Sequence, residues 1–481
     1  MSGEKQRIKL TFKSGAKKSP SNIPTQSSVP PQSTFETDNT PSKTDKLSRV
    51  STPLEAARRN MEIYSSLGIE SNDARRQALR SRRLKARRTV ALSPAPIPVT
   101  ASKNGFTRFW AELKSGVVTH VKKLDILLLF VIILLAAIGI LAVHSASLTM
   151  ASHRRMDLLQ IGGFIIGILA IVILPFFDYS ELLKHTKALF ILNVIILVYT
   201  AIFGFNPSGD SNRSWISLGF TNIQPAEFSK ILFIVTLSAH LEKVRDTVNK
   251  PLTLLGLFCH GGAVIGLVLT EQDWGNTLVF IAIFAIMLFA AKLDLRYILS
   301  LVGLGVISFP FIWEILGEFR RRRVLIGFNP DLDPLHYGFQ AIRSRNAIAS
   351  GGLFGQGYMQ GQTVQHPTAL AEKQNDMIFA VIGQEFGFIG CILVIAAFAF
   401  LIYRILRTAA RSKDYAGIYL CSGVAGLILF QFIINIGMAL GITPVVGITL
   451  PLVSYGTSSL LSVYFALALV MTVRANAYEK L

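Results

Sequence analysis

The amino-acid sequence predicts an all-α polytopic membrane protein with about ten transmembrane helices and a long extracytoplasmic loop between the seventh and the eighth. Hydrophobic residues make up 51% of the 481-residue chain and charged residues 16%, against about 25% charged in a typical soluble domain. Apolar runs long enough to cross a hydrocarbon core of about 30 Å recur between residues 124 and 473. Most of the positive charge precedes the first run.

The basic charge belongs to an N-terminal extension, residues 1–123. This extension holds 24 Lys and Arg against 9 Asp and Glu, so it carries +15 of the formal net charge of +19. Residues 1–50, rich in Ser, Thr, Pro, Gln and Lys, are predicted to be disordered. Residues 53–90 are predicted to form an arginine-rich helix that either lies on anionic lipid or is solvated without a partner. Nucleic-acid binding is not needed to explain the charge, and no removable signal peptide is expected.

The membrane domain is predicted to occupy residues 124–475, followed by a short cytoplasmic tail at 476–481. Its apolar segments are interrupted in places by Pro, Gly or polar residues, which membrane helices tolerate only beside protein or a wet cavity. The ten predicted spans cover residues 124–146, 158–177, 186–204, 223–241, 252–270, 275–291, 296–316, 377–403, 415–440 and 445–473.

The distribution of Lys and Arg in the connections predicts the orientation. With ten spans, the basic connections 241–251 and 404–413 fall on the same side as the basic extension, so both termini are predicted to be cytoplasmic. Two basic connections, His153–Arg155 and Arg320–Arg323, would lie on the outer side. The second violates the charge rule strongly enough to suggest a function, such as binding an anion.

The segment 213–230 contains the first candidate site. Gln224, Glu227 and Lys230 recur every three residues, which places them on one face of a helix, and Arg213 precedes them. A carboxylate and an ammonium at this spacing can pair, which lowers the cost of placing them near a membrane span. The pair either lines a functional cavity or is a structural ion pair that holds two helices together.

Two carboxylates lie at the outer end of the fifth span. Glu271 and Asp273 are costly at the edge of a membrane core, so they either face a cavity or a partner, or Asp273 caps the helix that begins near Gly275.

The long loop, residues 318–376, contains most of the unusual polar residues. Asp331 and Asp333 flank Leu332, and Asp333 precedes a proline, which favours a turn. A carboxylate fixed above an apolar bundle is well placed as a general base. The same residues would also occur in a turn that has no catalytic function. Glycines between 351 and 361 resemble a phosphate loop, but no strand precedes them, so neither a Rossmann nor a P-loop site is predicted.

Acidic residues also surround the start of the eighth span. Glu372 and Asp376 precede it and Glu385 lies within it, and an acidic residue inside an apolar segment indicates a functional site by default. Further along, prolines and polar residues between 443 and 455 interrupt an apolar region. Transporters use such broken helices too, so this feature does not separate an enzyme from a transporter.

Five motifs in this order resemble the SEDS (shape, elongation, division, sporulation) family, the RodA and FtsW proteins of bacterial cell-wall synthesis. The likeness runs from about 124 to 475, and its details are closer to RodA. The motifs are RSWISLG with IQPAEFSK, QDWGNT, NPDLDPLHYGF with AIASGGLFGQG, DMIFAVIGQEFGFIG, and NIGMALGITPVVGITLPLVSYG.

The resemblance implies a peptidoglycan glycosyltransferase that polymerises lipid II at the outer face of the cytoplasmic membrane, for cell elongation and shape, with a division role possible. Its implied partner is a class B penicillin-binding protein. The resemblance makes Asp333 the catalytic residue, and a divalent cation, Mg²⁺ or Mn²⁺, is a possible cofactor. The implied substrate-binding residues are Arg213, Glu227, Lys230, Asp273, Arg343, Glu372 and Asp376.

The chain departs from the family pattern near these residues, which leaves the details of the acceptor site open. The departures are Arg343, Ala371, Gln374, Asn375, Met377 and Thr457. Two other functions fit the same features: a flippase or transporter of lipid-linked cell-wall precursors, and a non-catalytic scaffold for a penicillin-binding protein.

Overall fold

The computed structural model describes residues 124–207, 213–219, 222–315, 317–336, 338–362, 366, 370 and 372–478. All of them belong to one compact unit, Lys103–Leu481. The predicted N-terminal extension lies outside the described residues, as do the last three residues of the predicted tail.

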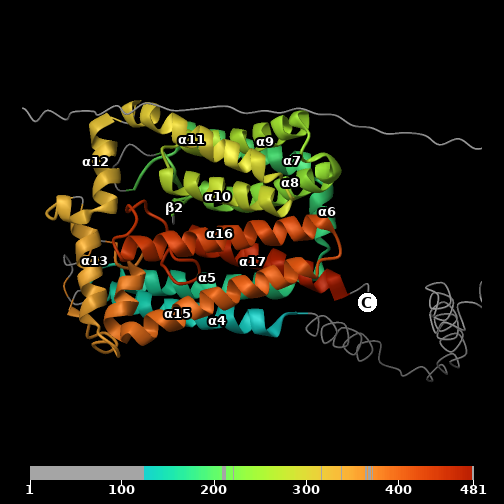
Figure 1. Cartoon of the computed structure of the whole chain (residues 1–481). Helices are drawn as coiled ribbons and strands as arrows, with labels where there is room; N and C mark the ends of the chain where they lie inside the picture. Colours follow the sequence, from blue (N-terminus) through green and yellow to red (C-terminus); the bar gives the residue numbers. More distant parts are fainter. Residues whose placement is uncertain are drawn as a thin grey trace, which may run out of the picture. The chain divides into compact units, whose positions relative to one another are not determined.

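The described part of the chain is built from helices, joined by one short hairpin (Figure 1). In the hairpin, β1 (Ile216–Ser217) pairs antiparallel with β2 (Asn222–Ile223). The helices are α4 (Ile126–Ser147), α5 (His153–Ile173), η1 (Leu174–Phe176), α6 (Tyr179–Lys184), α7 (Thr186–Phe203), α8 (Pro225–Val244), η2 (Arg245–Thr247), α9 (Pro251–Thr270), α10 (Trp274–Ala290), α11 (Leu295–Ile315), α12 (Gly317–Phe328), η3 (Pro330–Leu332), α13 (Phe339–Ser350), α15 (Ile378–Ala410), α16 (Tyr415–Ala439) and α17 (Thr457–Tyr478).

The predicted fold class is confirmed. Seven helices (α4, α5 with η1, α7, α9, α15, α16 and α17) are long and apolar enough to cross a membrane. Two shorter apolar helices, α10 and α11, coincide with two further predicted spans. The remaining predicted span coincides with α8, which is less apolar because it carries the buried Glu227 and Lys230. The chain is therefore a multi-pass membrane protein.

Helices α16 and α17 run through the middle of this unit, between α4, α5 and α15 on one side and α7 to α11 on the other (Figure 1). Helix α16 packs against α15, α10 and α8, while α17 packs against α5 and α8. Helices α12 and α13 lie across the ends of the bundle at one side, here called the α12–α13 face (Figure 1). The sequence alone predicted this region as a loop, whereas much of it is helical.

The last predicted span begins later than expected. Residues 440–456, here called the linking segment, are not helical, and α17 begins only at Thr457. Pro444 and Pro451 each lack the N–H that a helix requires, and Gly447 and Leu452 adopt positive φ angles of 75° and 65°. An apolar composition therefore does not extend the helix into this segment.

Helix α15 contains a break that explains part of the glycine-rich sequence before it. Gly387 has φ 66° and ψ −162°, and a Cβ there would lie 2.4 Å from the backbone nitrogen of Gly355. Around the break, Gln356 N–H donates to the Gln384 carbonyl at 2.9 Å and Phe388 N–H donates to the Gly352 carbonyl at 2.9 Å. The glycines at 355 and 387 therefore allow two backbone segments to approach closely.

Candidate active site

The first turn of α8 brings a charged pair into the protein interior. Pro225 takes the first helical position, where its missing N–H removes no hydrogen bond. Glu227 and Lys230 then point from the same face, and the Lys230 Nζ lies 2.7 Å from the Glu227 Oε1. The Lys230 side chain is fully buried and Glu227 is 4% exposed, so the predicted pair is confirmed and it is shielded from solvent.

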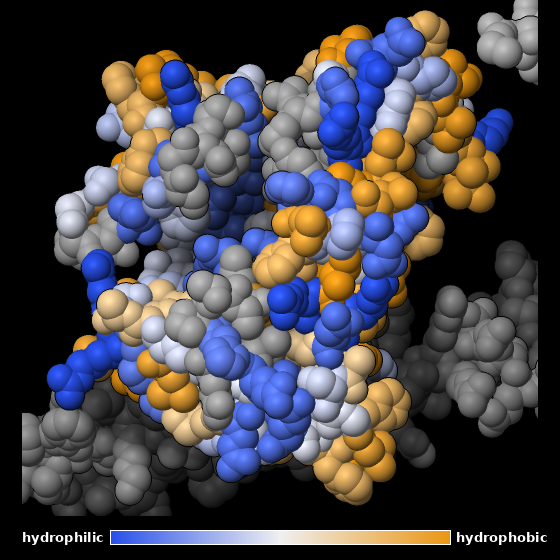
Figure 2. Space-filling view, turned by 90° about the vertical axis from the view of Figure 1, so that its left-hand side faces the viewer, coloured by the Kyte–Doolittle hydropathy of each residue, from blue (hydrophilic) through white to orange (hydrophobic). Residues whose placement is uncertain are grey.

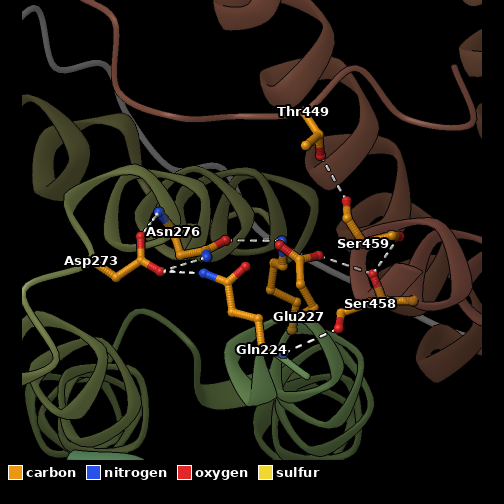
Figure 3. Close-up of polar contacts among 9 residues, drawn as sticks. Gln224, Glu227, Asp273, Asn276, Thr449, Ser458 and Ser459 are labelled. Atoms are coloured by element: carbon orange, nitrogen blue, oxygen red, sulfur yellow. Dashed lines mark hydrogen bonds and ion pairs between the residues drawn. The ribbon is translucent and has the colours of Figure 1, made fainter. Parts of the chain in front are cut away.

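Two further helices complete the hydrogen bonds of this pair (Figure 3). The Lys230 Nζ also donates to the Asn276 Oδ1 of α10 at 3.0 Å. The Ser462 Oγ of α17 donates to the Glu227 Oε2 at 3.1 Å. A buried ion pair is tolerated only when its remaining lone pairs and protons are satisfied, and these neutral partners do this.

Asp273 caps α10 and joins the same set of contacts. Its Oδ1 accepts from the Asn276 N–H at 3.0 Å, which is the predicted helix cap. Its Oδ2 accepts from the Asn276 Nδ2 at 2.9 Å and from the Gln224 Nε2 at 2.6 Å (Figure 3). The six residues Gln224, Glu227, Lys230, Asp273, Asn276 and Ser462 are here called the buried network. The predicted helix cap is therefore confirmed, while the alternative that Asp273 faces a cavity or a partner stays a prediction.

Glu271 lies beside this network but differs from Asp273. It is fully buried, and its carboxylate oxygens have no hydrogen-bond partner among the described residues. Burial, and then the nearby charge of Asp273, raises the pKa of Glu271 to about 8. The Glu271 carbonyl accepts from the Arg213 N–H at 3.1 Å, which holds the exposed Arg213 next to the network.

Replacing Glu271 with glutamine should flatten the dependence of stability on pH. The folded state keeps the Glu271 proton up to a pKa of about 8, whereas the unfolded chain loses it near 4.5. Stability is therefore greatest below the unfolded value and falls as pH rises through about 8, by on the order of 4 kcal/mol. Thermal unfolding in detergent between pH 5 and 9 measures this.

The matched control for that measurement is Glu181→Gln, because Glu181 is exposed and pairs with Lys184 on the surface. We expect Glu181→Gln to keep the wild-type pH profile and Glu271→Gln to lose most of the decline in Tm above pH 5. Identical profiles for wild type and Glu271→Gln would contradict a protonated, buried Glu271.

Asp333 lies in a tight turn, residues 329–338, here called the aspartate turn. The turn is closed by the Gly338 N–H, which donates to the Asp333 carbonyl at 2.9 Å. A Cβ on Gly338 would lie 2.1 Å from the Pro330 carbonyl oxygen, so this position requires glycine. The Asp333 side chain is 28% exposed, and its Oδ1 lies 3.1 Å from the His336 Nδ1. The carboxylate is thus held in place and reachable.

The other charged residues near Asp333 have contacts of their own. Asp331 is exposed and pairs with Arg345 at 3.0 Å, so the two aspartates of the turn have different environments. Arg343 is exposed on α13 and lies over the Phe339 ring at 5.1 Å.

The arginines predicted to bind an anion, Arg320–Arg323, belong to α12. Among them, Arg322 pairs with Glu318 at 2.8 Å and Arg321 donates to backbone carbonyls of α11. Arg322 therefore forms its ion pair within α12, and Arg321 bonds to the adjacent end of α11.

Glu372 and Asp376 lie in a turn before α15, residues 372–377, here called the acidic turn. Glu372 is exposed and accepts from the Asn375 Nδ2 at 2.7 Å. Loss of hydration, and then the charge of Glu372, raises the pKa of Asp376 to about 7. The departures Gln374 and Asn375 use their carbonyls to accept from the Tyr455 N–H, at 2.9 Å, and from the Ser454 Oγ. Those two acceptors are backbone carbonyls, whereas the side-chain amides of Gln374 and Asn375 donate to the Glu372 Oε2 at 3.4 Å and 2.7 Å, so both departures take part in the structure of this turn.

The linking segment contacts each of these three groups. Beside the aspartate turn, a Cβ on Gly441 would lie 3.5 Å from the Pro330 Cγ. Beside the acidic turn, a Cβ on Gly447 would lie 3.7 Å from the Asp376 Oδ2. Beside the buried network, the Thr449 Oγ1 lies 2.8 Å from the Ser459 Oγ, and the Ser459 carbonyl accepts from the Ser462 Oγ of the network at 2.9 Å (Figure 3). The α12–α13 face is hollowed near its middle, and hydrophilic residues line the hollow (Figure 2).

The structure thus brings Glu227, Lys230 and Asp273 into one network, with Arg213 beside it. It places Asp333 and Arg343 on the aspartate turn and α13, and Glu372 and Asp376 on the acidic turn. Sequence reasoning missed the neutral members Asn276 and Ser462. Spacing offers only a partial signal: Asn276 lies one helical turn after Asp273, and Ser458, Ser459 and Ser462 recur near the start of α17, but neither spacing shows which helices face each other.

These features define a class: a polytopic membrane protein in which a partly exposed carboxylate and a buried ion-pair network lie near one hollowed face. Residues 125–479 match the family of cell cycle proteins that comprises FtsW, RodA and SpoVE. The chain belongs to this family.

Three known proteins illustrate the likeness. A probable peptidoglycan glycosyltransferase FtsW of Trichlorobacter lovleyi is 33% identical over 362 residues, covering 73% of this chain and 93% of the relative. The peptidoglycan glycosyltransferase RodA of Treponema pallidum is 28% identical, covering 74% and 98%. A solved chain from a peptidoglycan synthase complex, studied for its coordination of polymerization and crosslinking, is 26% identical with a TM-score of 0.65, covering 74% and 99%.

These relatives confirm the predicted family and the predicted class of enzyme, a peptidoglycan glycosyltransferase. Both the FtsW and the RodA names occur among them, so the closer likeness to RodA stays a prediction.

Proposed function

We propose that this chain polymerises lipid II into glycan strands at the outer face of the bacterial cytoplasmic membrane, with both termini in the cytoplasm. The observation that carries the proposal is Asp333: a carboxylate held by a closed turn, 28% exposed, on the face with the hydrophilic hollow. In this orientation the α12–α13 face is the outer face, where a lipid-linked sugar would be presented.

The proposed reaction is an inverting glycosyl transfer with Asp333 as the general base. An Asp333 carboxylate oxygen takes the proton from the sugar 4-hydroxyl of the acceptor, whose oxygen then bonds to the anomeric carbon of the donor. The bond from that carbon to the pyrophosphate oxygen breaks, and undecaprenyl pyrophosphate leaves with the electron pair. His336, with its Nδ1 at 3.1 Å from the Asp333 Oδ1, orients the carboxylate.

The other predicted site residues divide into two roles under this proposal. Arg213 and Arg343 are exposed, so their guanidinium groups can bind the pyrophosphate by charge-assisted hydrogen bonds. Glu372 and Asp376 would bind the sugar hydroxyls of the acceptor. Because the hydrogen bonds of Glu227, Lys230 and Asp273 are satisfied within the buried network, we propose that this network supports the floor of the substrate site.

A divalent cation, Mg²⁺ or Mn²⁺, fits this proposal. Such an ion usually keeps several waters and is bound by one or two carboxylates together with substrate phosphates. The exposed part of the Asp333 carboxylate offers one such ligand. When bound, the ion would neutralise charge on the leaving pyrophosphate.

We further propose a class B penicillin-binding protein as the partner, which would crosslink the strands made here. The support is the similar chain in a peptidoglycan synthase complex in which polymerization and crosslinking are coordinated.

The experiment that tests the function uses the purified full chain, with and without a class B penicillin-binding protein, and fluorescent lipid II. We expect glycan polymer that a muramidase digests. The same protein in liposomes distinguishes the rivals: translocation of labelled lipid II without polymer would support a flippase, and neither polymer nor translocation would support a scaffold. Either result would overturn the proposal.

A further inference from the structure

The turn between α4 and α5 holds a cluster that the proposed function does not use. The His144 Nδ1 lies 2.8 Å from the Asp157 Oδ2, and the His153 Nε2 lies 3.4 Å from the same oxygen. The two imidazole rings are 4.8 Å apart. Among the described residues this is the one group of three metal-ligating side chains with its ligand atoms within 4.8 Å of one another.

Ser147 contacts the His153 ring on the side away from Asp157. The Ser147 Oγ lies 3.2 Å from the His144 carbonyl, to which it donates, and 2.7 Å from the His153 Nδ1. A hydroxyl that donates to the carbonyl can accept from an Nδ1 that carries the proton. In a neutral ring, the Nε2 lone pair therefore faces the Asp157 carboxylate at 3.4 Å. Two acceptors at this distance repel each other unless a positive charge lies between them.

The ligand set selects the kind of positive charge. Imidazole nitrogens suit Zn²⁺ and similar transition metals, whereas Mg²⁺ and Ca²⁺ prefer oxygen ligands. Tetrahedral Zn²⁺ with bonds of about 2.0–2.1 Å keeps its ligand atoms roughly 3.4 Å apart, which is the distance between the His153 Nε2 and the Asp157 Oδ2. The three side chains are half-buried, while the intervening Arg154 and Arg155 are exposed.

We propose that His144, His153 and Asp157 bind one Zn²⁺ ion, with a fourth position open to water. The contact from Ser147 to the His153 Nδ1 is the outer hydrogen bond that orients a metal-binding imidazole. The ion ties the end of α4 to the start of α5. This is a site separate from Asp333 and goes beyond the proposed polymerase.

The same turn contacts the segment that leads to the acidic turn. The Lys373 Nζ donates to the Thr149 Oγ1 at 3.2 Å, and the Tyr358 hydroxyl donates to the Leu141 carbonyl at 3.3 Å. Ser145 on α4 donates to Glu385 of α15. A metal ion here would therefore stabilise α4, α5 and the polypeptide on which Glu372 lies.

The test is metal binding by the purified full chain after treatment with a chelator and buffer exchange. We expect one equivalent of Zn²⁺ by titration calorimetry, no competition from millimolar Mg²⁺, and a rise in Tm of several degrees. Co²⁺ in place of Zn²⁺ should give the visible absorption of a tetrahedral site. His144→Gln/His153→Gln should bind at least tenfold more weakly, and Ser147→Ala about 10–100-fold more weakly.

The matched control is His240→Gln/His260→Gln, which removes another close imidazole pair, with Nδ1 atoms 3.1 Å apart. We expect this control to bind Zn²⁺ as the wild type does. If the first double variant does not fold, Ser147→Ala and Asp157→Asn give the same comparison. Equal Zn²⁺ binding by wild type and the site variants, no stoichiometric binding, or a protein stabilised by acid but not by Zn²⁺ would overturn the proposal.

Discussion

Asp333→Asn should lower the rate of lipid II polymerisation by about 10²–10⁴-fold, the contribution of a positioned general base. Asparagine keeps the size of the side chain and cannot take the proton of the acceptor hydroxyl. The closed turn does not depend on the carboxylate, because it is the Asp333 carbonyl that accepts from Gly338. The measurement is polymer length and initial rate with fluorescent lipid II, with Tm recorded on the same preparation.

Asp331→Asn is the control for that prediction. Asp331 is two residues away in the same turn, but it is exposed and pairs with Arg345. We expect this variant to keep the wild-type rate within a few fold. Equal losses in both variants would indicate that the turn needs two charges for its shape, and an unaffected Asp333→Asn would remove Asp333 from the mechanism.

Breaking the buried pair of α8 should have the largest effect on stability. Glu227→Ala leaves the ammonium of Lys230 fully buried with Asn276 as its other observed acceptor. Removing one partner of a buried ion pair costs about 3–5 kcal/mol, because the remaining charge is uncompensated. We expect a fall in Tm and poor recovery of folded protein, measured by thermal unfolding and size-exclusion chromatography in detergent.

The double variant Glu227→Met/Lys230→Met distinguishes structural support of the site from a direct role of the pair with substrate. Replacing both charges with apolar side chains is often neutral for stability, so it should recover most of the lost Tm. If the buried network only supports the floor of the site, activity returns with stability. A stable but inactive double variant would instead assign the pair a direct role with substrate.

The site residues that could be predicted from the sequence are the charged ones, because burying a charge costs free energy. Glu227, Lys230 and Asp273 stand out in the sequence because a charge beside an apolar span needs a reason, and the structure pairs all three. Asn276 and Ser462 do not stand out, since a single amide or hydroxyl is common in membrane helices. Their role depends on which helices face each other, and spacing within one helix does not contain that information.

The fold was predictable wherever composition and local geometry agree. Nine predicted spans coincide with helices, but the last did not begin where hydropathy placed it, because prolines and positive φ angles override an apolar composition. The long loop was also misjudged: α12 and α13 lie across the bundle, so they lack the uniform apolar character that identifies a span. The sequence likewise could not distinguish Asp331 from Asp333, because the contacts of Asp331 with Arg345 and of Asp333 with His336 are visible only in the structure.

The linking segment has one more consequence. Its carbonyls at Ile448 and Ser454 accept hydrogen bonds from Asn435 of α16 and Gln160 of α5, so it is clamped by the bundle while it contacts the aspartate turn, the acidic turn and the buried network. We therefore expect a tilt of α16 or α5 to displace the aspartate turn, the acidic turn and the buried network together. A partner that binds the lipid-facing side of either helix should then affect all three groups at once, without contacting any residue in them.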